Sequence, residues 1–222
     1  MINWLLTSKL KEPVSGLSHL LGLFLSVAGM MVLIYFSLIK GNPLHIISFT
    51  IYGISLILLY SASAIYHLLP LGEDGRHSLL KFDQTMIFVL IAGTYTPVCL
   101  IALRGDLGMN LLTSIWLIAL IGIILRIFWD GLPPWLPVVL YLIMGHFFFL
   151  AYNPIVRAMP EGAFRWLISG GFFYTTGTVV YALKRPVIIP KVLESHELWH
   201  FFVLLGSFCH FWMMYKYIAM IN

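Results

Sequence analysis

Hydrophobic residues occur along this chain in long, nearly continuous runs, and charged residues, glycines and prolines are concentrated in the short stretches between them. A helix that crosses the hydrocarbon core of a membrane needs about 20 predominantly apolar residues. The sequence contains seven runs of this kind, so we expect an all-α membrane protein with seven transmembrane helices. The predicted spans are Val14–Leu38, Ile46–Leu69, Leu79–Leu103, Leu107–Ile127, Pro134–Ala151, Ala163–Leu183 and His196–Met220.

The stretches between the runs are short and rich in turn-forming residues, such as "KGNP" at Lys40–Pro43 and "DGLPP" at Asp130–Pro134. Short connections place consecutive helices antiparallel and next to one another. We therefore expect residues 1–222 to form a single seven-helix transmembrane domain without a separate soluble part.

Two local features of the spans concern helix packing. Pro97 is expected to bend the third helix, because proline removes a backbone hydrogen bond. A stripe of small residues on the first span predicts that this helix packs closely against its neighbours. The stripe consists of Ser18, Gly22, Ser26 and Gly29.

Lysine and arginine residues set the expected orientation, because loops that face the cytoplasm carry an excess of positive charge. The side that contains the N-terminus receives eight of the 13 Lys and Arg residues, including Lys9 and Lys11, and the opposite side receives the other five. This bias predicts a cytoplasmic N-terminus and an external C-terminus.

The composition is that of a protein solvated by lipid. Hydrophobic residues make up 60% of the chain and charged residues 10%, with a mean hydropathy of +0.94, whereas a soluble domain carries about 25% charged residues. The net charge of +4 is explained by Lys and Arg residues near the ends of the spans. The sequence has no basic run and no glycine-rich dinucleotide or phosphate motif, so it indicates no nucleic-acid partner.

Ionisable residues inside membrane spans are costly to bury and are therefore candidates for a functional site. Three of the predicted spans carry polar residues at one common depth. These residues are Ser63 and His67 at the end of the second span, Asp83 at the start of the third, and His196 and His200 at the start of the seventh. With a rise of 1.5 Å per residue, all five are expected within about 10 Å of the inner membrane interface.

The spacing of three of these residues is that of a metal site. His196 and His200 are four residues apart, so their imidazoles lie on one face of a helix, and His67 reaches the same depth from another helix. Three histidines and a water make an open tetrahedral zinc site of the catalytic type. We expect Asp83 to hold the water or to support a ligand, and Ser63 lies one helical turn from His67.

The string HELWH at His196–His200 also matches the H-E-x-x-H pattern of zinc proteases, in which the glutamate is the general base. A metzincin requires a further histidine where this chain has Gly206, and no acidic residue follows the string to complete the motif of an intramembrane protease. Glu197 is also about 100° from His196 around the helix. The string is therefore better interpreted as H-x-x-x-H, a pair of metal ligands.

The remaining histidines fit this site less well. His45 and His77 lie in predicted links, where we expect them to be solvated. His210 lies about 15 Å further along the seventh helix than the H-x-x-x-H pair, too deep to bind the same ion. His146 lies in the middle of a span without an identifiable partner, and His19 is at the right depth to support the site.

At these residues the sequence resembles the haemolysin III branch of the progestin and adiponectin receptor family. The resemblance covers nearly the whole chain and rests on four blocks, "EPVSGLSHLLG", "SASAIYHLL", "FDQTMIFVLIAGTYTP" and "HELWHFFVLLGSFCHF". It implies seven helices with the N-terminus inside, and a zinc ion held by the histidines that match His67, His196 and His200. It also implies that the aspartate matching Asp83 contacts the water on this zinc, with the serine matching Ser63 beside it.

The wider superfamily of this branch includes alkaline ceramidases, and this implies hydrolysis of a lipid amide. We therefore expect a zinc-dependent, hydrolase-like protein that acts on or senses a membrane lipid or fatty acid, and so contributes to membrane lipid or membrane energy homeostasis. In catalysis Asp83 would orient or deprotonate the water, and Ser63 would donate a hydrogen bond to the developing oxyanion.

Two alternatives stay open. The first is a non-catalytic regulator or receptor in which the zinc clamps helices together, and the second is a pore-forming haemolysin, for which the sequence offers few charges to line a channel. The chain lacks the long N-terminal extension of the receptor branch, so we expect a multi-pass protein of a bacterial inner membrane.

Overall fold

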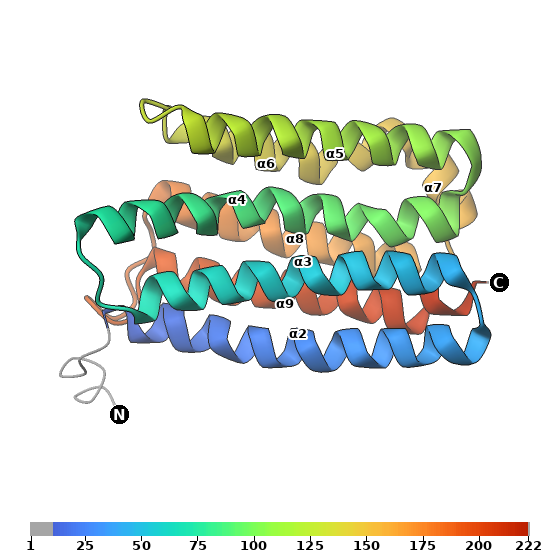
Figure 1. Cartoon of the computed structure of the whole chain (residues 1–222), viewed down its shortest axis with the longest axis horizontal. Helices are drawn as coiled ribbons and strands as arrows, with labels where there is room; N and C mark the ends of the chain where they lie inside the picture. The colour runs from blue at the N-terminus through green and yellow to red at the C-terminus, as the bar shows by residue number, and fades with distance from the viewer. Residues whose placement is uncertain (1–10, 222) are drawn as a thin grey trace.

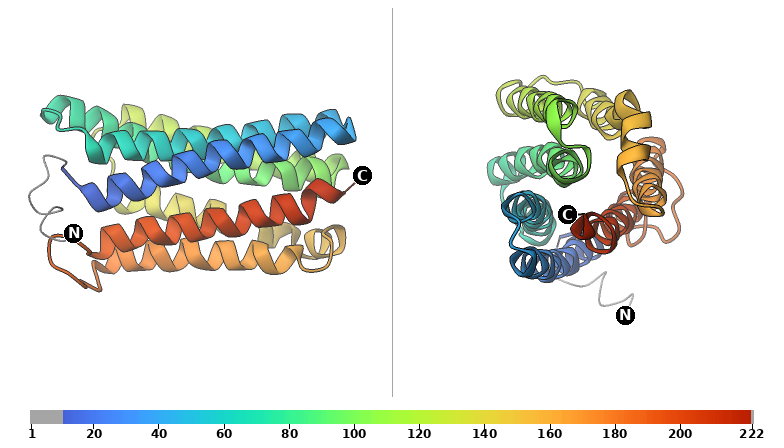
Figure 2. Two further views of the ribbon diagram at one scale, coloured as in Figure 1. Left: turned by 90° about the horizontal axis from the view of Figure 1, so that it is seen from below. Right: turned by 90° about the vertical axis from the view of Figure 1, so that its right-hand side faces the viewer.

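The computed structural model describes residues 11–221, and its elements are all helices apart from an isolated β-bridge between Ile189 and Leu193. Lys9, which contributes to the predicted orientation, lies outside the described residues. The helices lie side by side along one axis (Figure 1), and an end-on view shows them arranged as a ring (Figure 2). In chain order the elements are α2 (Pro13–Lys40), α3 (Pro43–Leu68), α4 (Glu73–Pro97), η1 (Val98–Leu103), α5 (Gly105–Phe128), α6 (Trp135–His146), η2 (Phe147–Ala151), α7 (Tyr152–Ala158), α8 (Ala163–Leu183), α9 (Ser195–Lys216) and η3 (Ile218–Met220).

These elements form seven helical spans, because η1 continues α4, η2 and α7 continue α6, and η3 continues α9. The prediction of an all-α, seven-helix protein is therefore confirmed. Six of the spans in the described part of the chain are long and apolar enough on their own to cross a membrane. The seventh, α8, has 21 residues and the predicted bounds, and it packs along α9. The side of the membrane that each end faces stays a prediction.

Two spans depart from regular α-helix where the sequence contains proline or a polar stretch. After Pro97 the third span continues as the π-helix η1, because a residue without an N–H disrupts the regular ladder and widens the next turn. The fifth span extends beyond its predicted end at Ala151, through the 3₁₀ turn η2 and into α7. The sequence at Asn153–Gly162 resembles a loop, but Pro154 lies in the first turn of α7, where proline is compatible with a helix.

The small residues of α2 form a packing face, as predicted. Ser18, Gly22 and Ser26 are buried, and α2 packs against α3 and α9. A Cβ on Gly22 would lie 2.7 Å from the ring of Tyr60 and 2.8 Å from Leu204, so only glycine allows this approach. The hydroxyls of Ser18 and Ser26 donate to carbonyl oxygens of their own helix and leave no polar group unsatisfied.

The prediction for His45 is wrong, because this side chain is buried rather than solvated. Asn42 caps α3 by accepting a hydrogen bond from the Leu44 backbone, and the helix therefore begins before His45. The ring packs edge-on against Phe49 and is 1% exposed. His77 is exposed as predicted, but it lies inside α4 rather than in a link, since this helix begins at Glu73.

Candidate metal centre

The candidate site lies at the end of the bundle where α3 ends and where α2 and α9 begin (Figure 1). A capping box fixes the start of α9: the Glu194 side chain accepts from the backbone of Glu197, and the Glu197 side chain accepts from the backbone of Glu194. His196 and His200 therefore occupy the first two turns of α9, and His67 occupies the last turn of α3.

The imidazoles of His67, His196 and His200 converge at this point. Nε2 of His196 lies 3.1 Å from Nε2 of His200 and 3.4 Å from Nε2 of His67. One ring nitrogen from each histidine lies within 4.8 Å of those of the other two, so the group can hold a metal ion. His67 and His200 are buried and His196 is half-buried. The structure thus brings together the three residues that the sequence predicts as ligands.

Glu12, which directly precedes α2, orients His67. Its Oε2 accepts a hydrogen bond from Nδ1 of His67 at 2.5 Å, and its backbone N–H donates to the His67 carbonyl oxygen. A proton on Nδ1 leaves the lone pair on Nε2, the atom that faces the other two histidines. The hydrogen bond with His67 lowers the pKa of the Glu12 carboxyl to about 2, so this group is ionised at neutral pH. Metal-binding histidines commonly have such a carboxylate partner.

The distances between the ring nitrogens fit a transition metal. Zn–N bonds of about 2.0–2.1 Å at tetrahedral angles separate two nitrogen ligands by about 3.3 Å, and the separations here are 3.1 and 3.4 Å. Lone pairs of neutral imidazoles at this distance repel one another unless a cation or a proton lies between them. A set of three imidazoles suits Zn, Cu, Fe and Ni. The residues therefore fit a metal ion of this group.

Asp83 on α4 and Ser63 on α3 lie near His67. Both side chains are buried, at 8% and 2% exposure. The Ser63 hydroxyl and His67 both lie near the Asp83 carboxylate.

Glu197, the central acidic residue of HELWH, has both carboxylate oxygens engaged in holding the helix start. Oε2 accepts from the backbone N–H of Glu194 at 3.0 Å, and Oε1 accepts from the Ser15 hydroxyl at 3.2 Å. The second contact joins α9 to α2. These bonds give Glu197 a capping role, which agrees with interpreting the string as H-x-x-x-H.

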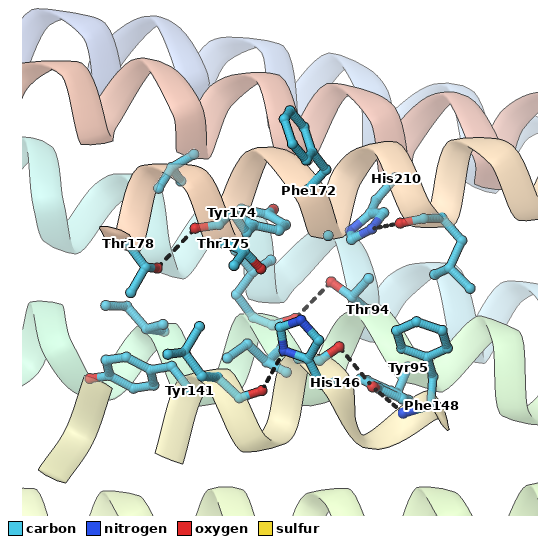
Figure 3. Close-up of a pocket in the computed structure, with 18 of the residues that line it drawn as sticks. Thr94, Tyr95, Tyr141, His146, Phe148, Phe172, Tyr174, Thr175, Thr178 and His210 are labelled. Carbon is cyan, nitrogen blue, oxygen red and sulfur yellow. Dashed lines mark hydrogen bonds between the residues drawn. The ribbon is translucent and has the colours of Figure 1, made fainter. Parts of the chain in front are cut away.

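A cavity of about 360 Å³ lies between α3, α4, α6, α8 and α9, and His67, His196 and His200 are not among the residues that line it. Ser63, Asp83 and His19 form part of its wall at the site, and most of the remaining lining is apolar. Figure 3 shows the middle of the cavity, where side chains of α4, α6 and α8 point toward one another. The hydroxyls of Thr94 and Thr178 in this region donate to carbonyl oxygens of their own helices, so they contribute little polarity.

Two further histidines line the cavity away from the three-histidine group. Nε2 of His210 on α9 lies 3.3 Å from the carbonyl oxygen of Leu167 (Figure 3). His146, at the junction of α6 and η2, donates from Nδ1 to the carbonyl oxygen of Leu142 at 2.9 Å. The partner of His146 that sequence reasoning did not find is thus a backbone carbonyl of its own helix.

Sequence reasoning missed the role of Glu12 as the partner of His67. The available signal was depth, since Glu12 directly precedes the first span and so lies at the level of the predicted ligands. His19, expected to support the site, contacts it by stacking: its ring lies face to face with that of His200, with centroids 3.8 Å apart.

Comparison with known proteins places the chain in a family. A profile described as "Haemolysin-III related" matches residues 7–211. The chain is 36% identical over 207 residues to "Hemolysin-3 homolog" of Bacillus subtilis, covering 93% of this chain and 94% of that protein. It is 33% identical over 214 residues to "Hemolysin-3" of Bacillus cereus, covering 96% and 94%.

A human protein is more distantly similar. "Monocyte to macrophage differentiation factor" is 27% identical over 175 residues, which cover 76% of this chain and 69% of the human protein. The family profile spans the three histidines as well as Ser63 and Asp83. The chain therefore belongs to the haemolysin-III-related family and is a multi-pass membrane protein with bacterial homologues.

Proposed function

We propose that this chain is a zinc-dependent, hydrolase-like membrane protein that acts on an amide or ester bond of a long-chain lipid and thereby contributes to membrane lipid homeostasis. One observation carries the proposal: three histidine nitrogens converge, and Asp83, a buried carboxylate near one of these histidines, lines a mostly apolar cavity. The histidines and the carboxylate would provide the chemistry, and the cavity would provide space for a hydrocarbon chain.

The number of ligands favours a catalytic site over a structural one. Among the described residues the group contains three histidines, and three protein ligands leave one tetrahedral position open, as in catalytic zinc sites. When bound there, Zn²⁺ would supply a Lewis acid that activates water and polarises a carbonyl group.

Asp83 is the proposed general base. Its carboxylate would accept a proton from the water that attacks the carbonyl carbon, and it would return this proton to the leaving amine or alcohol as the carbon–nitrogen or carbon–oxygen bond breaks. The reaction consumes one water and releases a fatty acid. Ser63, whose hydroxyl lies near this carboxylate, would hold it in position by donating a hydrogen bond to it.

The reaction can be tested with purified, zinc-loaded protein in lipid nanodiscs. A ceramide with an 18-carbon acyl chain and the corresponding acyl ester serve as substrates, and mass spectrometry measures the released fatty acid. We expect release from at least one of the two. The Asp83→Asn variant should retain its zinc but lose about 10²–10⁴-fold in rate. If neither substrate yields fatty acid above the level of zinc-free protein, the hydrolase proposal is wrong.

A second candidate function is a non-catalytic regulator in which zinc joins helices. The supporting observation is that the three histidines come from α3 and α9, which are far apart in the sequence, while Glu12 links α2 to the same point. In that case the Asp83→Asn variant would still restore the membrane phenotype of a strain that lacks the protein, whereas the His67→Ala variant would not restore it.

The names of the two Bacillus relatives suggest haemolysis, and a pore is the third candidate. The cavity gives it little support, because its lining is mostly apolar and would not stabilise a continuous water-filled path. A conductance measurement in planar bilayers would test it directly, and we expect no channel activity.

A further inference from the structure

The connection between α8 and α9, residues 184–194, exposes two adjacent large apolar side chains. Val187 is 51% exposed and Ile188 is 56% exposed, whereas Val192 in the same connection is buried. Exposed apolar residues within a span contact lipid, but Val187 and Ile188 lie beyond the end of α8. In water this pair of side chains would be unfavourable, so we expect an apolar environment around it.

The backbone of this connection pairs most of its own hydrogen-bonding groups. The amides of Ile188 and Ile189 both donate to the carbonyl oxygen of Leu193 at 3.0 Å, and the Leu193 amide donates to the Ile189 carbonyl oxygen at 2.8 Å. Pro186 and Pro190 have no N–H to satisfy. Unpaired backbone groups are costly to remove from water. Residues 186–193, called the α8–α9 turn below, avoid most of this cost.

The α8–α9 turn begins at a level that corresponds to the edge of the hydrocarbon core. α8 has 21 residues and is therefore about 31 Å long, close to the core thickness of about 30 Å. Lys184 follows in the left-handed conformation, with φ 53, and the chain leaves the helix axis there. An end-on view shows the connection passing along the outer side of α8 rather than across the ring (Figure 2).

Three cations flank the apolar tip. Lys184 and Arg185 precede it and Lys191 follows it, and all three are exposed. None of the ion pairs in the described part of the chain involves them. The single acidic residue of the connection, Glu194, belongs to the capping box of α9. Lysine and arginine near a membrane surface are attracted by anionic phospholipids, and an apolar tip between them fits the boundary between headgroups and acyl chains.

We propose that the α8–α9 turn inserts Val187 and Ile188 among the acyl chains of the surrounding bilayer, while the three flanking cations bind the phosphate groups of anionic phospholipids. The turn is then an interfacial anchor. It is joined to the helix that carries two of the candidate ligands, because the Glu194 side chain that caps α9 also accepts from the backbone N–H of Lys191 at 2.7 Å. The inference rests neither on bound zinc nor on hydrolysis.

Electron paramagnetic resonance of spin-labelled protein tests the insertion. Nitroxide labels are attached to Val187→Cys and Ile188→Cys in the full chain, in nanodiscs of phosphatidylcholine and phosphatidylglycerol. Both labels should collide with oxygen, which partitions among acyl chains, and should lose most collisions with a water-soluble nickel chelate. Asp74→Cys is the matched control, because Asp74 is exposed at the same end of the bundle (Figure 1), and its label should keep the nickel collisions. The native Cys99 and Cys209 are buried, and labelled wild type measures their background.

A second comparison tests the charged part of the proposal. The label of Val187→Cys should lie less deep in nanodiscs of phosphatidylcholine alone than in the mixture with phosphatidylglycerol. Adding Lys184→Gln, Arg185→Gln and Lys191→Gln should remove this difference. The same label depth in both lipids before these substitutions would overturn the binding of anionic phospholipids.

Nickel collisions at positions 187 and 188 equal to those at position 74 would overturn the insertion, and would leave the tip as a surface for a soluble partner. Nanodiscs expose both faces of the bilayer to the nickel chelate, so the result does not depend on the orientation of the chain. Because the readout is label depth, failure of this proposal is distinguishable from failure of the proposed hydrolysis.

Discussion

Nδ1 of His67 donates a hydrogen bond to Oε2 of Glu12 at 2.5 Å, and the Glu12 backbone N–H donates to the carbonyl oxygen of the same histidine. The first helix is thereby attached to the candidate metal centre through a residue that is not itself in the ligand group. The side-chain bond also fixes the tautomer of His67, so that Nε2 faces His196 and His200. Glu12 should therefore affect how tightly the three histidines bind a metal ion, although it is not itself a ligand.

This relationship predicts a graded loss of metal affinity in a Glu12 variant. Glu12→Gln keeps an oxygen acceptor but removes the negative charge, so His67 becomes a weaker ligand. We expect the zinc affinity to fall about 10–100-fold, measured by competition with a chelator of known affinity. Glu161→Gln, which changes an exposed carboxylate before α8, should have no effect. Equal affinities for Glu12→Gln and the wild type would show that the contact does not support the ligand.

Glu197 should affect stability rather than metal binding or chemistry. Glu197→Ala removes one half of the capping box and the bond to Ser15, so we expect a loss of about 1 kcal/mol and a fall in Tm of about 2–4 °C. Glu197→Gln keeps an acceptor and should be close to the wild type in zinc content and in any hydrolysis. If Glu197→Gln kept its zinc but lost all hydrolysis, Glu197 would be a general base and the capping interpretation would be wrong.

The sequence was sufficient to predict the helices and the meeting of the three histidines. Long apolar runs determine the spans, and depth along a helix follows from its rise per residue. Because consecutive helices are antiparallel, His67 and the H-x-x-x-H pair are expected at one depth, and the spacing of four residues places His196 and His200 on one helix face. The position of α7 was not predictable in this way, because Asn153–Gly162 has loop composition and becomes helical only in its tertiary context.

Burial and pairing of individual polar residues were harder to predict. His45 lies in a helical turn that Asn42 caps, and the helix packing that covers its ring cannot be read from the local pattern. The partner of His146 is a backbone carbonyl, which every helix offers. The contact between Glu12 and His67 depends on how α2 and α3 approach each other, and the sequence specifies the depth of these residues but not their rotation about the helix axes.

The orientation predicted from the Lys and Arg count can be tested with reporters. A reporter fused after Asn222 should be external, and one inserted after Pro70, in the link before α4, should be cytoplasmic. The physical reason is the excess of positive residues on the N-terminal side. Alkaline phosphatase and green fluorescent protein fusions give opposite signals on the two sides. Strong fluorescence of the C-terminal fusion would reverse the orientation and place the metal site at the other face.

The central claim is that His67, His196 and His200 hold one zinc ion, and metal analysis of purified protein tests it most directly. Inductively coupled plasma mass spectrometry should give close to one zinc per chain for the wild type and for His210→Ala, whose ring lies outside the group. Each of His67→Ala, His196→Ala and His200→Ala should lose the zinc and at least about 5 °C in Tm, because metal binding contributes to folding free energy. If all three variants retain zinc at the wild-type level, the proposed site is wrong.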